Sequence, residues 1–397
     1  MNYSWHRRSM DSIFNGALTN SKRVECFVKG VYPTHIKHGL GAHLRDADNK
    51  KYIDFICALG TNLLGYANQQ LNEAIIRQLY KGTIYSLGST LEVTAAEAVK
   101  EIVPFISRLR FLKTGSDACN AAVRIALAHT GREKVLSHGY HGIYDQFVSL
   151  TPPALGIAKQ NHIETLTAFD QITKEVACVI IEPIITDYSP ERIKYLNELK
   201  EVCKKNGTLL IFDEVITGFR WKNWTFSNDS GIHPDIITLG KCIGGGLPLS
   251  VVACKAGIGE DKEWFVSSSF AGDTTAMAGL LETIKLLRNK YDINHLWDKG
   301  SEFIGRFNEI EPNIVKIDGY PTRGVFVADQ LNKALFFQES CKAGILFGPS
   351  FFFNFTHIEY MDSVLNSCRD ILTRIKHKQI ELEGELPISP FAQKMRE

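Results

Sequence analysis

The sequence predicts an α/β protein in which a mostly parallel β-sheet lies between helices. Two observations lead to this fold class. Between residues 108 and 255, apolar runs too short to form helices alternate with stretches of helical spacing, a pattern typical of a parallel sheet covered on both faces. The chain is also large enough to bury such a sheet, with 397 residues of which 44% are hydrophobic and 22% charged.

Each element follows from its local pattern. Residues 42–55 predict a hairpin with its turn at Asp48 and Asn49. The predicted helices 117–129 and 191–206 lie between strands, and the second begins after Ser189-Pro190 and ends before Gly207. Residues 276–288 and 360–376 predict further helices, with mixed strands near 314–329, so we expect a smaller α+β domain built from both chain ends. The predicted strands of the large sheet are 109–112, 135–137, 177–181, 208–212, 236–239 and 249–254.

Composition excludes several classes of protein. Lys and Arg number 45 against 44 Asp and Glu, so the chain lacks the positive charge that drives nucleic-acid binding. No apolar run is long enough to cross a bilayer, and no apolar segment follows Arg7-Arg8 to form a secretory signal. The nine scattered cysteines include no Cys-x-x-Cys pair, which indicates buried thiols in a reducing compartment. We therefore expect a cytoplasmic protein with no membrane or nucleic-acid partner.

The end of the first predicted strand carries a candidate anion site. There the chain passes through Lys113-Thr114-Gly115-Ser116 into a helix, and the first turn of a helix directs backbone N–H groups at an anion such as phosphate. The structural alternative is an ordinary strand-to-helix turn in which Ser116 caps the helix. His138 and His141 are three residues apart, but no third ligand or His-Glu-x-x-His frame accompanies them, so no metal site is predicted.

Two further strand ends carry reactive side chains. Asp213 follows the strand 208–212, where a carboxylate is costly to bury without a cationic partner. Lys241 follows the strand 236–239 and precedes a run of glycines, so its amine can reach a pocket as a nucleophile and base. Taken alone, Asp213 can be interpreted as a salt-bridged acid and Lys241 as an ordinary surface lysine. Together with a phosphate-binding turn, they are what a pyridoxal 5′-phosphate (PLP) enzyme requires.

The chain resembles the class III, fold type I aminotransferases, and within them most closely the glutamate-1-semialdehyde 2,1-aminomutases. The similarity extends from Gly30 to Asp362 and is densest in residues 209–220 and 234–241. It implies a PLP-dependent transferase with a seven-stranded sheet, which works as a homodimer with shared active sites. The implied large PLP-binding domain is 54–285 and the small domain 286–397, while residues 1–53 contribute to the small domain and the dimer interface.

The resemblance also assigns roles to individual residues. Lys241 matches the lysine that forms the Schiff base with PLP, and Asp213 matches the partner of the pyridine nitrogen. Tyr140 resembles the aromatic residue that stacks on the ring, and Ser269, aligned by Ala276-Met277-Ala278, stands where a residue of the neighbouring subunit binds the phosphate. Arg23 lies one position from the arginine expected to hold the substrate carboxylate. The remaining cofactor-binding residues implied are Gly115, Ser116, His141 and Val215.

The expected activity is the transfer of an amino group on a small amine or amino-acid-like substrate, as in an aminotransferase or a 2,1-aminomutase. A PLP-dependent decarboxylase acting on an amino acid or its conjugate is the alternative enzyme. A non-catalytic binding protein on the same fold would lack Lys241 or Asp213. The residues on the substrate side depart from the family, since Leu59 replaces its tryptophan and the stretch after Glu182-Pro183 is shortened. The substrate, free or attached to a carrier, stays open.

Overall fold

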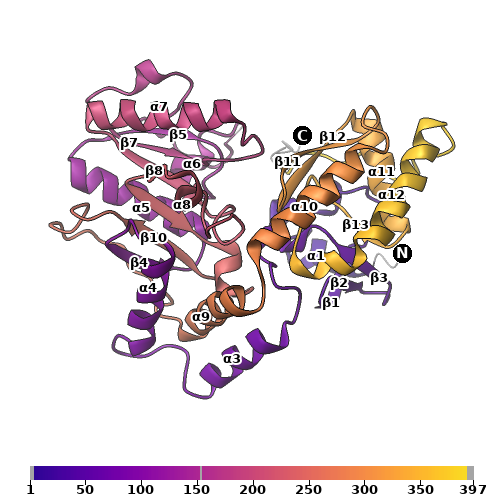
Figure 1. Cartoon of the computed structure of the whole chain (residues 1–397), viewed down its shortest axis with the longest axis horizontal. Helices are drawn as coiled ribbons and strands as arrows, with labels where there is room; N and C mark the ends of the chain where they lie inside the picture. Colours follow the sequence, from indigo (N-terminus) through magenta and orange to yellow (C-terminus); the bar gives the residue numbers. More distant parts are fainter. Residues whose placement is uncertain (1–3, 153, 391–397) are drawn as a thin grey trace. The chain divides into compact units, whose positions relative to one another are not determined.

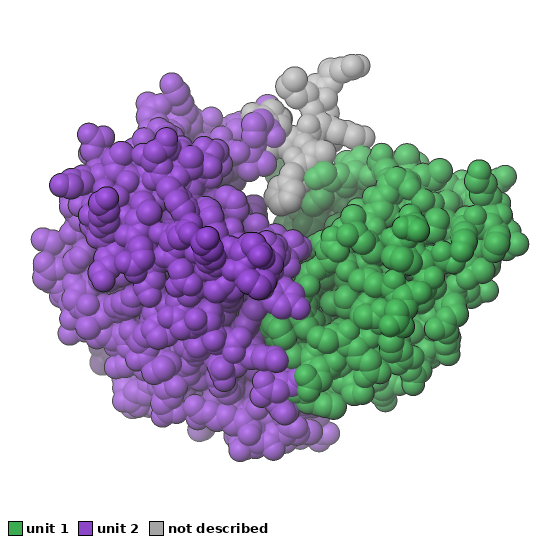
Figure 2. Space-filling model, turned by 45° about the horizontal axis from the view of Figure 1, so that its top comes forward, with its two compact units in different colours: residues 1–68, 295–397 green, residues 69–294 purple. Residues whose placement is uncertain are grey.

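The computed structural model describes residues 4–152 and 154–390, which form two compact units. Unit 2 is Gln69–Asn294, and unit 1 comprises the described residues of 1–68 and 295–397 (Figure 2). The resemblance implies divisions after residues 53 and 285. A division after residue 285 falls inside the helix α9 (Thr274–Asn289), and the strand β3 (Lys51–Asp54) is followed by further residues of unit 1.

Unit 2 contains the predicted seven-stranded, mostly parallel sheet. Its strand order is β4-β10-β9-β8-β7-β5-β6. The strand β10 runs antiparallel to both of its neighbours, and all other neighbouring strands pair in parallel. Six strands match predicted apolar runs, whereas β6 was missed because it has three residues, of which only Ile163 is buried. The strands are β4 (Arg108–Leu112), β5 (Lys134–His138), β6 (Ile163–Thr165), β7 (Val176–Ile181), β8 (Leu209–Glu214), β9 (Ile236–Leu239) and β10 (Ser250–Cys254).

Helices bury this sheet, as the unbroken apolar runs predict. Every residue of β7 is buried, which requires cover on both of its faces. The helix α5 (Gly115–Thr130) packs against β7, β9 and β10, and α7 (Pro190–Asn206) packs against β8 (Figure 1). Away from the sheet, α9 packs against α3 (Gln69–Leu79) and α4 (Thr90–Ile102). The short helices α6 (Asp145–Val148) and α8 (Phe226–Ser230) complete the unit.

Unit 1 has two small sheets with the order β1-β2-β3-β13 and β11-β12-β14. The predicted hairpin is present as β2 and β3, and the carboxylate of Asp46 holds its turn by accepting the N–H groups of Asp48 and Lys50 at 2.9 Å. The strands are β1 (Ile36–Leu40), β2 (His43–Asp46), β11 (Lys316–Tyr320), β12 (Arg323–Val327), β13 (Ile345–Leu346) and β14 (Ser350–Phe352), and the helices are α1 (Ser4–Ser12), α2 (Cys57–Gly60), α10 (Ile293–Asn308), α11 (Gln330–Lys342) and α12 (Met361–Lys376).

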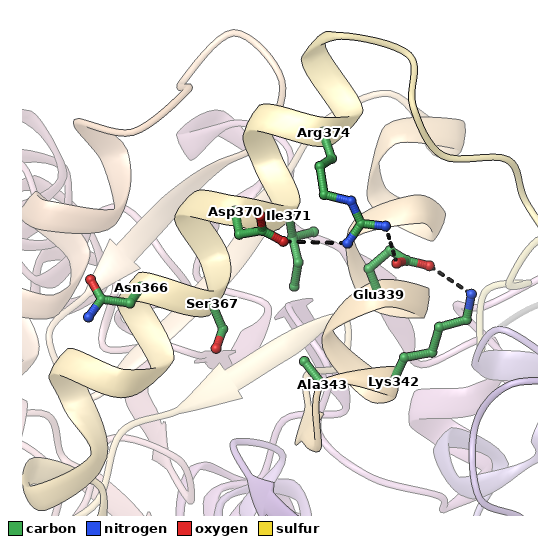
Figure 3. Close-up of a pocket in the computed structure, with 8 residues that line it drawn as sticks. All are labelled: Glu339, Lys342, Ala343, Asn366, Ser367, Asp370, Ile371 and Arg374. Carbon is green, nitrogen blue, oxygen red and sulfur yellow. Dashed lines mark hydrogen bonds and ion pairs between the residues drawn. The ribbon is translucent and has the colours of Figure 1, made fainter.

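A surface groove of unit 1 lies between α11 and α12 (Figure 3). Its central charge is the carboxylate of Glu339, which pairs with Lys342 at 2.9 Å and with Arg374 at 3.1 Å. Arg374 also pairs with Asp370 at 3.4 Å. Because these charged side chains already pair with one another, we interpret them as structural ion pairs between the two helices.

Two expectations from composition can be compared with the described residues. The nine cysteines are all free and buried. Among the helices of residues 4–152 and 154–390, none has both the length and the apolar character needed to span a bilayer.

Candidate active site

The turn after β4 leads into the first residues of α5, the candidate anion site. Thr114, rather than Ser116, caps this helix, because the Thr114 hydroxyl accepts the N–H of Asp117 at 3.2 Å while the Asp117 carboxylate accepts the N–H of Thr114 at 2.8 Å. The Ser116 side chain is therefore not used as the cap. Its oxygen accepts the N–H of Ile143 at 3.2 Å, which leaves the hydroxyl proton available for an anion.

Val215 lies between this turn and the segment that leads to Lys241. A Cβ added to Gly115 would lie 2.7 Å from Val215 Cγ1, and one added to Gly240 would lie 3.1 Å from the same atom. Gly240 directly precedes Lys241. The structure thus brings Gly115, Val215 and the residue before Lys241 into contact, and the absence of side chains at both glycines lets the three segments approach closely.

Asp213 lies buried at the end of β8, with a side chain only 5% exposed. Its Oδ1 atom accepts the N–H of Val215 at 3.0 Å and the hydroxyl of Thr238 at 3.3 Å, and Thr238 is its register partner on β9. Burial by itself would raise the pKa of Asp213. The hydrogen bond and charge of His141, the Val215 N–H and the charge of Lys241 outweigh it and hold this pKa below its usual value, so the carboxylate is ionised.

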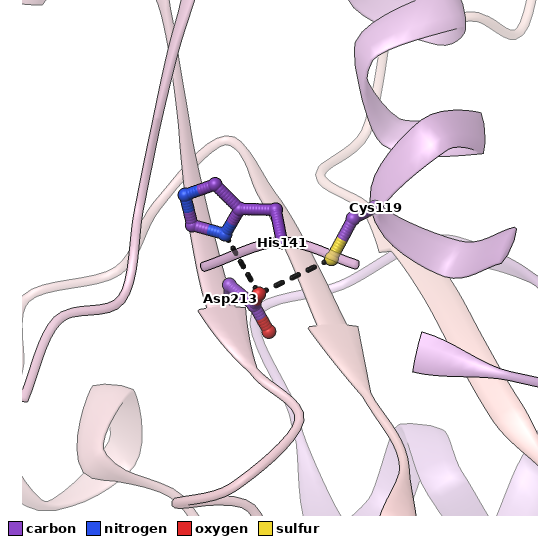
Figure 4. Close-up of side chains that lie close together, drawn as sticks. All are labelled: Cys119, His141 and Asp213. Carbon is purple, nitrogen blue, oxygen red and sulfur yellow. Dashed lines mark hydrogen bonds and ion pairs between the residues drawn. The ribbon is translucent and has the colours of Figure 1, made fainter. Parts of the chain in front are cut away.

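Cys119 and His141 meet at the other oxygen of Asp213 (Figure 4). His141 Nδ1 lies 2.8 Å from Asp213 Oδ2, and the Cys119 sulfur lies 3.2 Å from the same oxygen. His141 Nε2 lies 3.2 Å from the backbone oxygen of His138, so the ring donates to both partners when both nitrogens carry protons. The side-chain ligand atoms of Cys119, His141 and Asp213 lie within 4.8 Å of one another. Such a grouping could hold a metal ion, and the sequence did not predict it.

The backbone of Tyr140 is held beside Glu182. Its N–H donates to Glu182 Oε1 at 2.9 Å, and Gly139, with a φ of +110°, turns the chain closely past that carboxylate. The Tyr140 side chain stays half exposed, as a residue that stacks on a ligand requires. Burial, followed by the nearby charges of Cys119, Asp213 and Glu182, raises the pKa of the Tyr140 phenol, so the phenol remains protonated at neutral pH.

Lys241 follows β9 in a left-handed backbone conformation, with a φ of +49°. For a residue with a side chain this conformation costs about 1–2 kcal/mol, and such strain concentrates at functional sites. The next residue fixes the turn, because the buried Cys242 thiol donates to the Gly218 carbonyl at 3.3 Å. The charge of Lys241 also lowers the pKa of Asp213.

Two predicted residues lie apart from this cluster in the chain. Ser269 is exposed in the turn that precedes α9. Arg23 belongs to unit 1, where its guanidinium donates to the backbone oxygens of Asn20 at 3.3 Å and Pro390 at 3.4 Å.

Sequence reasoning missed three residues that support the cluster. Cys119 was interpreted only as a small buried residue of a helix, and Thr238 only as part of an apolar strand. Glu182 was noted for the loop after it and not for the bond to Tyr140. The pairing of β8 with β9 was the available signal for Thr238, since the residue opposite a buried acid in a parallel pair lies within reach of it.

These residues fit PLP. The cradle of Gly115 and Ser116 at the start of α5 suits a phosphate. The ionised, buried carboxylate of Asp213 suits a protonated pyridine nitrogen. An amine such as that of Lys241 is the group that PLP enzymes bond to the cofactor aldehyde.

The chain belongs to the class-III aminotransferase family, whose model matches residues 28–161 and 154–351. Members of this family, this chain included, are PLP-dependent enzymes of the aminotransferase and aminomutase type.

Two curated relatives are glutamate-1-semialdehyde 2,1-aminomutases. That of Aquifex aeolicus is 32% identical over 398 residues, which cover 87% of this chain and 93% of the relative. That of Haloarcula marismortui is 31% identical over 381 residues, which cover 87% of this chain and 84% of the relative.

Solved structures confirm the predicted fold type I. The FumI protein of Sphingopyxis sp. MTA144, in its PLP internal aldimine form, superposes with a TM-score of 0.86 at 24% identity and covers 96% of this chain and 98% of its own. An omega-transaminase from Sphaerobacter thermophilus superposes with a TM-score of 0.82 at 21% identity, covering 94% and 97%.

Gly142 provides a test of the phosphate turn. A Cβ at this position would lie 2.7 Å from the Cα of Ser116, so we expect Gly142→Ala to displace the turn. PLP binding should then weaken at least tenfold, which corresponds to a loss of roughly 1.4 kcal/mol in binding free energy. The matched control is Gly131→Ala, because Gly131 also has a positive φ of +68° but open space around it. Gly131→Ala should lose about 1–2 kcal/mol of stability from its left-handed backbone alone, and Gly142→Ala should lose more, because its Cβ also meets Ser116. Equal PLP dissociation constants for the two would contradict the assignment of the turn.

Proposed function

We propose that this enzyme moves an amino group on a small amine or amino-acid-like substrate, with Lys241 as the lysine that bonds to PLP and Asp213 as the partner of its pyridine nitrogen. One observation carries the proposal. An ionised, buried carboxylate lies at the end of β8, and the neighbouring strand β9 leads directly to a lysine whose charge acts on that carboxylate. A structural ion pair would not require the left-handed backbone at Lys241.

Asp213, His141 and Lys241 have different roles in the proposed reaction. When bound, PLP supplies a ring that withdraws electrons from the substrate carbon. Asp213 keeps the ring nitrogen protonated through its negative charge, and His141 keeps Asp213 ionised through its hydrogen bond. Lys241 Nζ takes a proton from the substrate carbon and returns it at a different carbon.

The phosphate and ring faces need separate supports. Gly115 and Ser116 hold the phosphate through the N–H groups at the start of α5 and the Ser116 hydroxyl. The half-exposed Tyr140 would support one face of the ring and Val215 the other. Arg23, whose guanidinium is always charged, binds a substrate carboxylate.

The site is completed by a second copy of the chain. Unit 2 exposes large apolar side chains on α3, on α4 and in the segment between these helices, and a group of exposed apolar side chains favours a protein interface there. Its members are Ile76, Leu79, Tyr80, Ile84, Tyr85, Leu87 and Val93. The exposed Ser269 then binds the phosphate in the neighbouring subunit, and the enzyme is a homodimer with shared active sites.

The reaction is tested with a panel of amines and amino acids, including glutamate 1-semialdehyde, the substrate named for the curated relatives. Absorbance reports conversion of the cofactor, and mass spectrometry identifies the product. A keto product with a second, aminated product indicates an aminotransferase, and an isomer of the substrate indicates an aminomutase. Release of carbon dioxide with retention of the amine, or no turnover of any amine by enzyme that binds PLP, would contradict the proposal.

A further inference from the structure

Ser269 lies in an exposed loop of unit 2, residues 267–272, which we call the Ser269 loop. The side chains of residues 267–270 are exposed, so burial contributes little to holding them in place. The position of Ser269 therefore depends on the residues at the two ends of the loop. Both ends are bonded to the chain segment that contains the phosphate turn, residues 114–116.

Lys113 holds the end of the Ser269 loop. It lies between β4 and the capping residue Thr114, and its Nζ atom donates to Asp273 Oδ2 at 2.8 Å. The two side chains are only 17% and 19% exposed, so water and salt screen this pair less than they screen a surface ion pair. Partial burial would raise the pKa of Asp273, but hydrogen bonds from Lys113 and Thr275 hold it below its usual value. The carboxylate is therefore ionised at neutral pH.

Arg110 of β4 holds the beginning of the loop. Its guanidinium donates to the backbone oxygen of Val266, the buried residue just before the loop. Arg124 of α5 donates to the backbone oxygen of the preceding residue, Phe265. The strand β4 and the helix α5, which flank the phosphate turn, thus hold both ends of the Ser269 loop.

Asp273 also joins the loop to the apolar segment between α3 and α4. Its carboxylate caps α9 by accepting the N–H of Thr275 at 3.0 Å. The next residue, Thr274, donates its N–H to the Thr83 oxygen at 3.0 Å and its hydroxyl to the Gly82 oxygen at 2.9 Å. Residues 82 and 83 belong to the segment whose exposed apolar side chains we assign to the subunit interface. The loop, the phosphate turn and that segment are therefore connected through Asp273.

We propose that Lys113 and Asp273 are positioning residues whose ion pair fixes the Ser269 loop, so that the Ser269 hydroxyl can reach the PLP phosphate of the neighbouring subunit. The inference rests on the proposed function, because it takes Ser269 as a phosphate-binding residue. The ion pair acts on PLP through the position of Ser269, and neither Lys113 nor Asp273 is itself a ligand of the phosphate.

Two substitutions of similar size remove the ion pair. Asp273→Asn keeps an oxygen that can accept the Thr275 N–H, because asparagine caps helices as well as aspartate does. Lys113→Met keeps most of the length of the side chain without its charge. The cap and the packing should therefore remain, and only the ion pair is lost.

The affinity for PLP is compared with that for pyridoxal, which has the ring and aldehyde of PLP but no phosphate. Full-length enzyme freed of cofactor is titrated with each ligand. Asp273→Asn and Lys113→Met should each bind PLP about three- to tenfold more weakly, the effect of one lost hydrogen bond, and bind pyridoxal as the wild type does. A merely structural role would weaken the binding of both ligands.

A double-mutant cycle shows whether the ion pair acts through Ser269. Ser269→Ala alone should weaken PLP binding by a similar factor. Adding Asp273→Asn to Ser269→Ala should weaken it by less than about a further factor of two, whereas the effects of independent changes multiply. Lys113→Arg, which keeps the charge, should recover most of the affinity that Lys113→Met loses.

Lys255→Met is the matched control. It breaks the ion pair of Lys255 with Asp235 at 3.5 Å, directly after β10 of the same sheet, and should leave both dissociation constants unchanged. Because Lys113→Met and Asp273→Asn remove the same pair from either side, the test holds even if one of them fails to fold.

Three results would overturn the inference. The first is equal weakening of PLP and pyridoxal binding, and the second is multiplication of the effects of Asp273→Asn and Ser269→Ala. The third is tighter PLP binding by Asp273→Asn, which would make the released Lys113 a direct ligand of the phosphate. If Ser269→Ala binds PLP as the wild type does, the role of Ser269 in the proposed function fails, and the inference fails with it.

Discussion

Asp213→Asn should lower turnover by roughly two to three orders of magnitude, the effect typical of removing one essential electrostatic partner of a reacting group. The amide keeps the size of the side chain and can still accept from Val215 and Thr238. The amide carries no charge. The pKa of the ring nitrogen therefore loses the increase of roughly 1–3 units that a neighbouring carboxylate provides. Cofactor should remain bound through Lys241 and the phosphate turn. Turnover and bound PLP are measured on the same preparation.

The matched control is Asp235→Asn. Asp235 lies beside the same sheet, just before β9, where its carboxylate accepts the Leu210 N–H at 2.9 Å and pairs with Lys255 at 3.5 Å. This variant should lose some stability and keep wild-type turnover. Near-normal turnover of Asp213→Asn would contradict the electron-withdrawing role, and loss of cofactor from it would show that Asp213 serves binding instead.

Mixing two inactive variants should restore activity if the active sites are shared. Lys241→Ala removes the reactive amine, and Ser269→Trp blocks the phosphate contact, since loss of the hydroxyl alone is worth only about 0.5–1.5 kcal/mol. If Ser269 serves the neighbouring subunit, each hybrid dimer has one site with both parts intact. Random reassociation should therefore recover about a quarter of wild-type activity, because half of the dimers are hybrids with one good site of two.

The control for this experiment is Ser267→Trp, which adds the same bulk at an exposed neighbouring position and should leave the enzyme active. Native mass spectrometry verifies that hybrids form. Verified hybrids without activity would show that Ser269 acts within its own chain or only packs. A fully active monomer at low concentration would reject the shared site altogether.

The large sheet was predictable because its strands are buried on both faces. Such strands are short, unbroken apolar runs, and six of the seven could be recognised from that pattern alone. The edge strand β6 could not, since two of its three residues are exposed and carry no such signal. The helices α3 and α4 were missed for a related reason. They pack mainly on α9, and both precede the first strand of the sheet, so they do not alternate with its strands.

The candidate site was predictable where chemistry follows a strand. Asp213 and Lys241 are polar residues that end apolar runs, and the parallel topology brings such ends to one edge of the sheet. The partners of Asp213 were not predictable, because a cysteine on a buried helix face and a threonine within a strand resemble ordinary core residues. The cap of α5 was mistaken because Thr114 and Ser116 are equally suited by type, and only geometry selects Thr114.

The central claim is that Lys241 bonds to PLP, and borohydride reduction followed by peptide mapping tests it most directly. Borohydride fixes the cofactor on the amine that holds it, and mass spectrometry then identifies the labelled residue. We expect a single pyridoxyl group on Lys241, and no label in Lys241→Ala treated in the same way. A pyridoxyl group on another lysine of the wild-type enzyme, or no label on enzyme saturated with PLP, would contradict the account.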